Sequence, residues 1–360
     1  MWNVTRRRRT ESDSGGDFST NIISDGNEYI ATIYLGNPLV KVTVMVDTGS
    51  GVNWIKGPPI YDAKKSRTYE PRFCDGGCPF RSGCEHFSDL CRYRIEYADG
   101  AFSTGIISYD NFAFEDLDGI VKNIGNLQFG YATESKDFSG QENGNLGLNR
   151  ESISFVSQLG IQKFSHCLVS MDNIKGSRMH FGPSANVNGV KLPYDPTLDF
   201  HYFVTLEGIK VGNKYVEISP GVFAFNKNIQ DSGVIFDIGT TFSTLYQKCY
   251  DPFAREMRNQ MMKVQFVKPI NFFDMCFRGT KRDFDELPTV MFEFDKMRLT
   301  FSKANTYVEV ARNVLCLGIL PEKNYQISII GNFQMRDMLI GYDLANHQIA
   351  FANANCNNYT

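Results

Sequence analysis

One short pattern occurs twice in the 360 residues: an apolar run that ends in Asp-x-Gly followed by a hydroxyl residue. The run VTVMV precedes Asp47–Ser50, and the run GVIF precedes Asp237–Thr240. An apolar-glycine pair follows each copy after a similar interval, Leu146-Gly147 in the first case and Ile330-Gly331 in the second. Because the two aspartates lie about half a chain apart, the repetition predicts two related lobes that each present one carboxylate.

An Asp-x-Gly sequence after a strand has an ordinary structural interpretation, because Asp bonds to nearby backbone groups and Gly supplies positive φ in turns. Two copies in apolar surroundings, each with a hydroxyl residue after the Gly, favour a chemical role instead. Two carboxylates held close together cannot both ionise at little cost, so they share one proton. One of them then acts as a base while the other acts as an acid. The candidate pair is Asp47 and Asp237.

The rest of the chain is dominated by short runs of β-type residues, punctuated by turn residues that include 31 glycines and 13 prolines. These runs predict strands at 29–35, 40–46, 92–97, 202–206, 233–236, 289–294 and 327–330. Helical periodicity is limited to residues 246–261 and a short segment at 154–159. The sequence therefore predicts a mainly β protein and argues against a doubly wound α/β fold, which needs many more amphipathic helices.

The charge balance limits the partners that the chain can have. With 37 basic and 40 acidic residues the net charge is −3, which gives no sign of a nucleic-acid or membrane-surface protein. No apolar run approaches the roughly 18 residues of a membrane-spanning helix.

We expect a polar, disordered tail over 1–26, a first lobe over 27–190, a second lobe over 191–356 and a short tail over 357–360. We also expect a monomer.

Nine cysteines are the least ordinary part of the composition. Cys74, Cys78, Cys84 and Cys91 lie close together, with His86 among them, which is compatible with a zinc site or with two disulfides. Their spacing departs from the paired C-x₂₋₄-C pattern that is typical of zinc sites. Disulfides require an oxidising compartment, but the sequence begins with no recognisable signal peptide. Disulfides would therefore indicate an oxidising compartment, whereas the N-terminus gives no sign of a signal that would bring the chain there.

Longer stretches resemble the pepsin-like aspartic proteases, namely DTGS, DIGTT, YADGA and IIGNFQMRDMLIGYDLANHQIAFANANC. FSHCL, GLNRESISFVSQLG and the cysteine cluster before Tyr97 are similar to the nepenthesin-like group of plant enzymes, so that the resemblance covers residues 27–356. It implies a bilobal, mainly β fold of two related barrel-like lobes with a central cleft. It also implies an endopeptidase that cleaves polypeptides at acidic pH and needs neither a metal nor an organic cofactor.

The resemblance also gives roles to individual residues. Asp47 and Asp237 match the catalytic pair, which would hold a water molecule between them. The residues that match the supporting parts of the two loops are Thr48, Gly49, Ser50, Gly239 and Thr240. In the family, hydroxyls at the positions of Ser50 and Thr240 hold the outer carboxylate oxygens, which helps to keep the pair partly ionised.

A flap over the cleft is implied in the same way. Tyr97 matches the flap tyrosine that closes over substrate and excludes water. Trp54, seven residues after Asp47, matches the tryptophan whose indole N–H steadies that tyrosine.

Position 238 departs from the family pattern, because relatives carry Ser or Thr there and this chain has Ile238. The family hydroxyl bonds the backbone of the opposite loop, and a lost buried hydrogen bond costs about 1 to 3 kcal/mol. If all of that cost fell on the barrier, the rate would drop roughly 5- to 150-fold. We therefore expect a weakened protease. The alternative is a catalytically impaired protein of the same fold that binds peptides or proteins, or inhibits a partner.

A third Asp-x-Gly sequence lies just upstream of Asp237, at residues 231–233. It follows a polar stretch instead of an apolar strand, and Val234 stands where the hydroxyl residue is needed. Asp237 is therefore preferred to Asp231.

The resemblance finally implies how the cysteines pair, with Cys249 left over. The implied disulfides are Cys74–Cys91, Cys78–Cys84, Cys167–Cys356 and Cys276–Cys316. Such pairing implies a secreted, extracellular or vacuolar protein, and an incomplete N-terminus would then explain the missing signal peptide.

Overall fold

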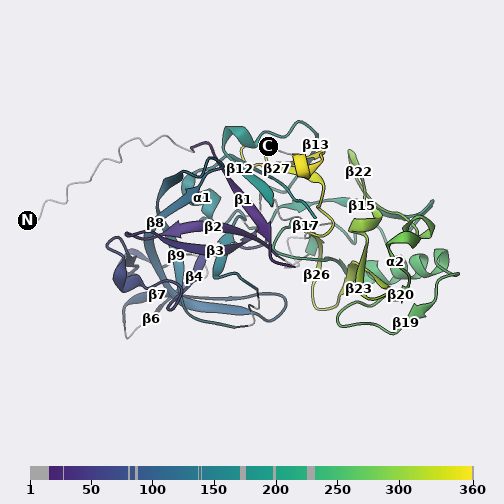
Figure 1. Cartoon of the computed structure of the whole chain (residues 1–360), viewed down its shortest axis with the longest axis horizontal. Coiled ribbons are helices and arrows are strands. Elements are labelled where there is room, and N and C mark those ends of the chain that lie inside the picture. The colour runs from purple at the N-terminus through teal and green to yellow at the C-terminus, as the bar shows by residue number, and fades with distance from the viewer. Residues whose placement is uncertain are drawn as a thin grey trace, which may run out of the picture.

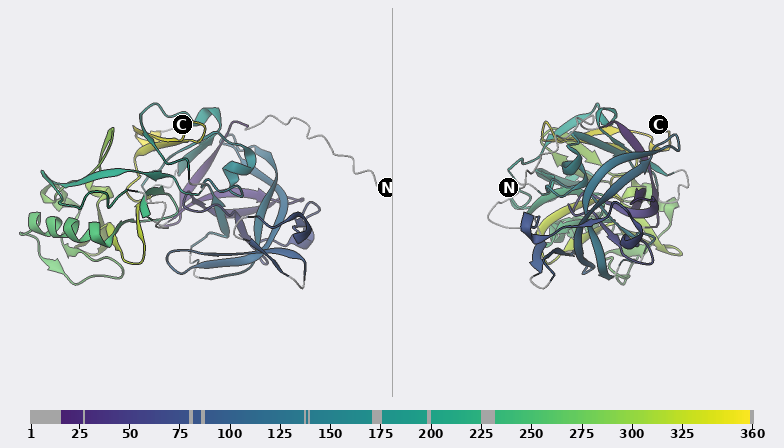
Figure 2. Two further views of the ribbon diagram at one scale, coloured as in Figure 1. Left: turned by 180° about the vertical axis from the view of Figure 1, so that it is seen from behind. Right: turned by 90° about the vertical axis from the view of Figure 1, so that its left-hand side faces the viewer.

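The computed structural model describes residues 16–26, 28–79, 82–85, 88–136, 138, 140–170, 176–197, 200–224 and 232–358. His86, Asp231, most of the N-terminal tail and the last two residues of the expected C-terminal tail lie outside these ranges. Figure 1 shows two β-rich lobes side by side, the first in purple to blue and the second in green. The view from behind in Figure 2 shows the same two lobes. The predicted mainly β, bilobal fold is confirmed.

The largest sheet has 15 strands and includes segments from both ends of the chain. In spatial order its strands are β13 (Val190–Pro193), β28 (Gln348–Asn353), β27 (Met338–Asp343), β11 (Lys163–Cys167), β12 (Ser177–Phe181), β1 (Phe18–Ser24), β2 (Tyr29–Leu35), β3 (Val40–Asp47), β10 (Gly144–Gly147), β4 (Trp54–Lys56), β9 (Val121–Lys136), β8 (Phe102–Glu115), β7 (Leu90–Glu96) and β6 (Ser82–Glu85), with β5 (Glu70–Pro71) paired to β8. Strands from the C-terminal end thus lie beside strands of the first lobe, which ties the two lobes together.

Three smaller sheets form the second lobe. The first contains β14 (Phe203–Val204), β17 (Ser232–Asp237), β26 (Gln326–Gly331), β18 (Ser243–Tyr246) and β25 (Ile319–Glu322). The second contains β16 (Lys214–Tyr215), β15 (Leu206–Val211), β21 (Val290–Phe294) and β22 (Met297–Thr300). The third contains β19 (Phe266–Val267), β20 (Cys276–Arg278), β24 (Val314–Leu317) and β23 (Tyr307–Ala311).

Helices are few, as the periodicity predicts. The α-helices are α1 (Phe155–Leu159) and α2 (Gln247–Gln260). The short 3-10 helices are η1 (Ala63–Lys65), η2 (Cys74–Gly76), η3 (Pro183–Ala185), η4 (Lys281–Glu286), η5 (Lys303–Asn305) and η6 (Cys356–Asn358). Helix α2 buries Tyr250, Phe253 and Met257 on one face and continues through Pro252. Among the described residues, no helix is long and apolar enough to cross a membrane.

The N-terminal tail expected over 1–26 is too long, because residues 18–24 form strand β1 of the largest sheet. This strand pairs with β12 on one side and β2 on the other. Phe18 and Ile22 are buried, and the Phe18 ring stacks on Phe181 at 4.7 Å. The prediction was wrong because FSTNIIS carries few apolar residues, and its partners are strands far along the chain.

The disulfides correct one part of the implied pairing. Cys167–Cys356 and Cys276–Cys316 are present, and Cys249 is free and buried, as implied. In the N-terminal cluster, however, the pairs are Cys74–Cys84 and Cys78–Cys91. Cys74 begins the short helix η2 and Cys78 follows that helix, and their partners Cys84 and Cys91 lie on β6 and β7, so that each sulfur meets a different strand of the β6–β7 hairpin. These four sulfurs are consumed in disulfides, so the cluster has no thiolate to offer zinc.

Candidate functional site

The two Asp-x-Gly loops occupy equivalent places in the two lobes. Asp47 ends β3, which runs parallel to β10 and pairs Asp47 with Gly147. Asp237 ends β17, which runs parallel to β26 and pairs Asp237 with Gly331. The intervals noted in the sequence therefore correspond to a repeated strand arrangement. It delivers both aspartates to the boundary between the lobes.

The two carboxyl groups lie against each other's loops. A Cβ atom on Gly49 would stand 2.6 Å from Asp237 Oδ2, and one on Gly239 would stand 2.5 Å from Asp47 Oδ1. Any side chain at either glycine would therefore collide with the opposite carboxylate. Asp47 and Asp237 are also almost fully buried, at 3% and 6% exposure. The structure brings together the two residues that the sequence predicts as a pair.

Hydrogen bonds hold each carboxylate in place. The Gly49 N–H donates to Asp47 Oδ1 at 2.7 Å, and the Gly239 N–H donates to Asp237 Oδ1 at 2.9 Å. The outer oxygens accept from hydroxyls: Asp47 Oδ2 from Ser50, and Asp237 Oδ2 from Thr240 at 2.7 Å. Both loops thus use residues at equivalent positions for the same purpose, and the hydroxyl contacts are those expected of Ser50 and Thr240.

Sequence reasoning missed one further residue of this network. The Asn145 side-chain amide donates to the Ser50 hydroxyl at 2.7 Å, and this leaves the Ser50 proton for Asp47. Asn145 directly precedes the Leu146-Gly147 pair, so its position in the repeat was the available signal.

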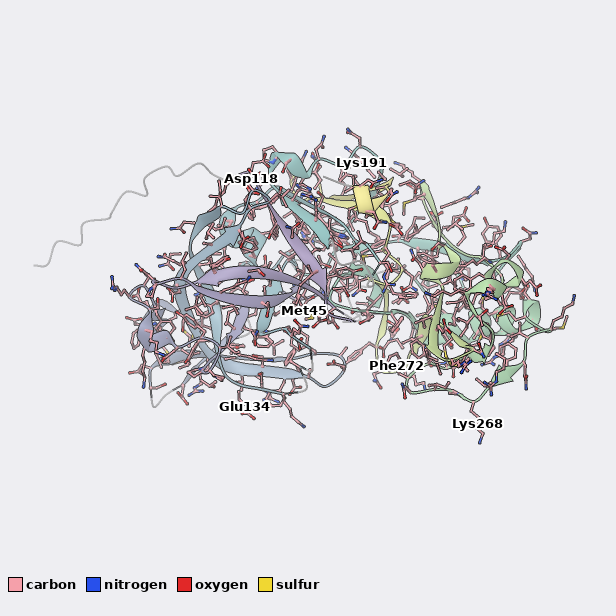
Figure 3. All side chains as sticks on the ribbon, viewed as in Figure 1. Met45, Asp118, Glu134, Lys191, Lys268 and Phe272 are labelled. Carbon is pink, nitrogen blue, oxygen red and sulfur yellow. A yellow bond between two sulfur atoms is a disulfide. The ribbon has the colours of Figure 1, made fainter. Side chains whose placement is uncertain are left out.

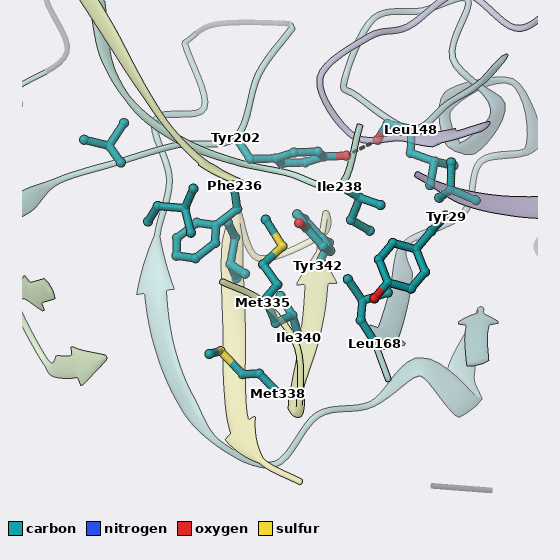
Figure 4. Packing of buried hydrophobic residues seen from close by; sticks show 14 of the residues in the cluster. Tyr29, Leu148, Leu168, Tyr202, Phe236, Ile238, Met335, Met338, Ile340 and Tyr342 are labelled. Carbon is teal, nitrogen blue, oxygen red and sulfur yellow. Dashed lines mark hydrogen bonds between the residues drawn. The ribbon is translucent and has the colours of Figure 1, made fainter. Parts of the chain in front are cut away.

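The contact between the two loops is one-sided. Thr48 Oγ1 accepts from the Ile238 N–H at 3.0 Å and donates to the Phe236 carbonyl at 3.2 Å. Ile238 has no hydroxyl to return such bonds to the first loop. Its side chain is instead fully buried, and Figure 4 shows it in the apolar cluster that includes Tyr202 and Tyr342. The hydrogen bonds from Thr48 to the second loop are therefore present, whereas those from position 238 to the first loop are replaced by apolar packing of Ile238.

Burial raises the pKa of both aspartates above the usual range of a carboxyl group. For Asp47, the nearby charge of Asp237 raises the pKa further, whereas the bonds from Ser50 and Gly49 lower it. For Asp237, the bonds from Thr240 and Gly239 lower the pKa against the effect of burial. The pair therefore retains a proton more readily than two separate carboxylates do.

An aromatic group lies over the first loop. The Trp54 indole N–H donates to the Tyr97 hydroxyl at 2.7 Å, the contact expected for these two residues. Trp54 is fully buried. Burial raises the pKa of the Tyr97 phenol, and the nearby carboxylate of Asp47 raises it further. Phe138 meets both rings edge-on, at 4.8 Å from Trp54 and 5.5 Å from Tyr97. Phe138 belongs to none of the motifs, so the sequence did not reveal it.

A cleft of about 780 Å³ runs past the pair between the lobes. Tyr97 and Ala98 of the first lobe line one part of it, and Phe242, Leu320 and Ile327 of the second lobe line another. In Figure 3, Met45 lies at the inner edge of the first lobe, with Phe272 across from it on the second lobe. Cavities of this size are sufficient to bury several side chains of an extended peptide.

Two family profiles together match most of the chain. Residues 29–183 match the family described as "Xylanase inhibitor N-terminal", and residues 201–353 match "Xylanase inhibitor C-terminal". The chain is 28% identical over 388 aligned residues to a probable aspartic protease of Arabidopsis thaliana, covering 98% of this chain and 86% of that protein. It is 26% identical over 356 residues to the aspartic proteinase nepenthesin-1 of Nepenthes gracilis, covering 94% and 80%.

A similar solved structure supports the fold independently. The crystal structure of the protein named edgp superposes with a TM-score of 0.79 at 20% identity, covering 97% of both chains. At this level of identity the likeness concerns the fold alone.

Proposed function

Since the chain belongs to the nepenthesin-like group of plant pepsin-like aspartic proteases, we propose that it is an endopeptidase with Asp47 and Asp237 as its catalytic pair. The observation that carries this proposal is the close, buried approach of two carboxylates at the floor of the cleft, each with its own N–H and hydroxyl donors. The cleft of about 780 Å³ that Asp47 and Asp237 line suits a polypeptide substrate.

The geometry supports a reaction that needs only one proton on the pair. A water molecule between the carboxyl groups would lose a proton to the ionised one as its oxygen attacks the peptide carbonyl. The protonated carboxyl would donate to the carbonyl oxygen, which gives a gem-diol. Collapse of the gem-diol breaks the C–N bond while a proton passes to the leaving amine. The buried site strengthens both interactions because little water competes for them.

A second function, binding or inhibition without efficient catalysis, has two observations in its favour. The matching family profiles are described as xylanase inhibitor domains, and Ile238 removes half of the contact between the catalytic loops. We rank it below proteolysis because both carboxylates and both outer hydroxyls are retained. The four disulfides also lead us to propose an oxidising compartment, secreted or vacuolar, for either function.

The test is cleavage of an unfolded protein substrate between about pH 2 and 7, with and without a transition-state analogue that carries a hydroxyl in place of the scissile carbonyl. We expect cleavage that the analogue blocks. No cleavage at any pH, with retained binding of the analogue, would instead identify a binding protein. Cleavage that ignores the analogue would contradict the assignment of the pair.

The pH profile of kcat/KM is expected to be bell-shaped and confined to the acidic side. The pair must hold one proton, so activity is lost as pH rises through its upper pKa, by about tenfold per unit. Activity is also lost below the lower pKa, where both carboxyls are protonated. Burial and the neighbouring charge raise the pKa of Asp47, which extends the upper limb towards neutral pH. A rate that keeps rising through alkaline pH would exclude this pair as the acid and base.

Trp54→Phe is expected to lower kcat/KM by about 3- to 10-fold, because it removes the donor to the Tyr97 hydroxyl while keeping an aromatic ring. Phe155→Leu, a core change in the same lobe but away from the cleft, is the matched control for a general loss of stability. Steady-state kinetics and thermal unfolding of both variants decide the question. A Trp54→Phe enzyme with unchanged kinetics would show that Tyr97 needs no such support.

A further inference from the structure

The cleft is unusually one-sided in charge. Of the described residues that line it, nine carry a carboxylate, one is a histidine and none is a lysine or arginine. The chain as a whole has a net charge of only −3, so these groups are concentrated at the cleft. Such a lining creates a negative potential that attracts cations. Two of the nine are the proposed catalytic pair, and the other seven have no part in the proposed chemistry.

Three of these carboxylates gather beside the catalytic pair, and we call Asp25, Glu28 and Glu142 the acidic trio. Asp25 and Glu28 belong to the turn between β1 and β2, and Glu142 lies two residues before β10. A Cβ atom on Gly140 would collide with both Asp25 Oδ2 and Glu142 Oε2, so these two oxygens lie over the same face of that glycine. Glu28 is close enough to feel the charges of Asp25, Glu142 and both catalytic aspartates.

Backbone N–H groups hold two members of the trio in place, but no cationic side chain of the described residues pairs with the carboxylates. Asp25 Oδ2 accepts from the Gln141 N–H at 2.8 Å, and Glu142 Oε1 accepts from the Gly140 N–H at 3.2 Å. Glu142 is only 4% exposed and lines the cleft, yet its Oε2 atom has no hydrogen-bond partner among the described residues. Glu28 Oε2 is likewise buried without a partner.

A lysine beside the trio bonds a backbone carbonyl and an aromatic ring instead of the carboxylates. Lys56 donates from Nζ to the backbone carbonyl of Glu142 at 2.9 Å and lies 5.6 Å from the Phe138 ring centre. Within the described chain, no lysine or arginine forms an ion pair with a member of the trio. The remaining contact is the Thr241 hydroxyl, 3.5 Å from Glu28 Oε1. An ionised carboxylate that is buried without a cation is costly, so it takes up a proton unless a cation binds beside it.

We propose that the acidic trio is a subsite for a cationic side chain, arginine or lysine, of the polypeptide substrate. This inference rests on the proposed function and gives it a substrate class. A guanidinium group offers five donors in a planar fork, which suits two carboxylate oxygens on one face together with a third nearby. An extended peptide advances about 3.3 Å per residue, so the trio is reached from a position close to the scissile bond.

Proton exchange follows from the same arrangement. Burial, then the charges of Asp47, Asp237, Asp25 and Glu142, raise the pKa of Glu28 to about 8. Without a cation Glu28 is therefore protonated over the acidic range, and a bound guanidinium would favour its ionised form. Binding of the cation releases that proton, so selectivity for the cation rises with pH.

The test compares peptide substrates that carry arginine or citrulline at one position, scanned on both sides of the scissile bond. Citrulline keeps the shape and removes the charge. At one position we expect arginine to be favoured at least tenfold in kcat/KM near the upper end of the active range, and less at lower pH. Glu142→Gln and the double variant Asp25→Asn with Glu142→Gln should reduce that ratio to within about threefold of unity.

Glu322→Gln removes a cleft carboxylate of the second lobe and is the matched control, which should keep the preference. The dissociation constants of a non-cleavable peptide in its arginine and citrulline forms separate this inference from the proposed function, because they need no turnover. Equal binding of the two forms at every position, or a preference that survives the trio variants, would overturn the subsite. A protein that never cleaves but binds the arginine form more tightly would keep the subsite and refute the protease.

Discussion

Asp47→Asn is expected to lower kcat/KM by about 10³- to 10⁴-fold, measured on a peptide substrate at the pH optimum. Asparagine has nearly the shape of aspartate: its Oδ1 can still accept from the Gly49 N–H, and its Nδ2 can donate to the Ser50 hydroxyl once that hydroxyl turns its own proton away. It cannot ionise, however, so the pair loses the group that exchanges a proton with water and substrate. The loop should stay folded, because removing one of two buried, mutually repelling carboxylates relieves an unfavourable interaction.

The matched control is Asp231→Asn, which changes the aspartate of the neighbouring Asp-Ser-Gly sequence. We expect that variant to keep full activity, while Asp237→Asn should be as inactive as Asp47→Asn. Thermal unfolding of all three variants separates lost chemistry from lost structure. An active Asp47→Asn enzyme, or an inactive Asp231→Asn enzyme of normal stability, would overturn the choice of the pair.

Ile238→Thr is expected to raise kcat/KM by roughly 5- to 150-fold, because it restores a hydroxyl that can bond the backbone of the first loop. Thr48 already makes the corresponding bonds in the other direction, at 3.0 Å to the Ile238 N–H and 3.2 Å to the Phe236 carbonyl. A second set would fix the position of Asp237 relative to Asp47 from both sides. The gain should appear in kcat, since these bonds do not touch substrate.

Ile238→Val is the control for this experiment, because valine has the size and branching of threonine without the hydroxyl. Ile238→Val removes a buried methyl group and should lose about 0.5 to 1.5 kcal/mol of stability, and Ile238→Thr should lose more unless its hydroxyl finds the expected backbone partner. The comparison of Thr with Val therefore isolates the hydrogen bond. Equal kinetics in the two variants would show that the packing of Ile238 in the core cluster, and not the missing bond, governs the loop.

Local patterns predicted the elements that present the site. The strand over 29–35 forms as predicted, and the strand predicted at 40–46 extends to Asp47 itself. The repeated Asp-x-Gly sequences were informative because the aspartate of each is the last residue of a strand. A parallel neighbouring strand pairs with that aspartate through Gly147 in the first lobe and through Gly331 in the second. Predictions failed where the partner is remote. The strand at 18–24 was missed because it is stabilised by residues of β12, more than 150 positions away.

By itself, the sequence determined the mainly β, two-lobed fold and the repeated placement of the two aspartates at strand ends. The spacing of apolar residues and the residue types that form turns are local properties, so they can be recognised without coordinates. Only the tertiary structure decided which cysteines pair in the N-terminal cluster and which half of the contact between the two Asp-x-Gly loops is kept. It alone also showed that Asp25, Glu28 and Glu142 share one wall of the cleft. These features depend on distances between segments far apart in the chain, and such distances are set by packing.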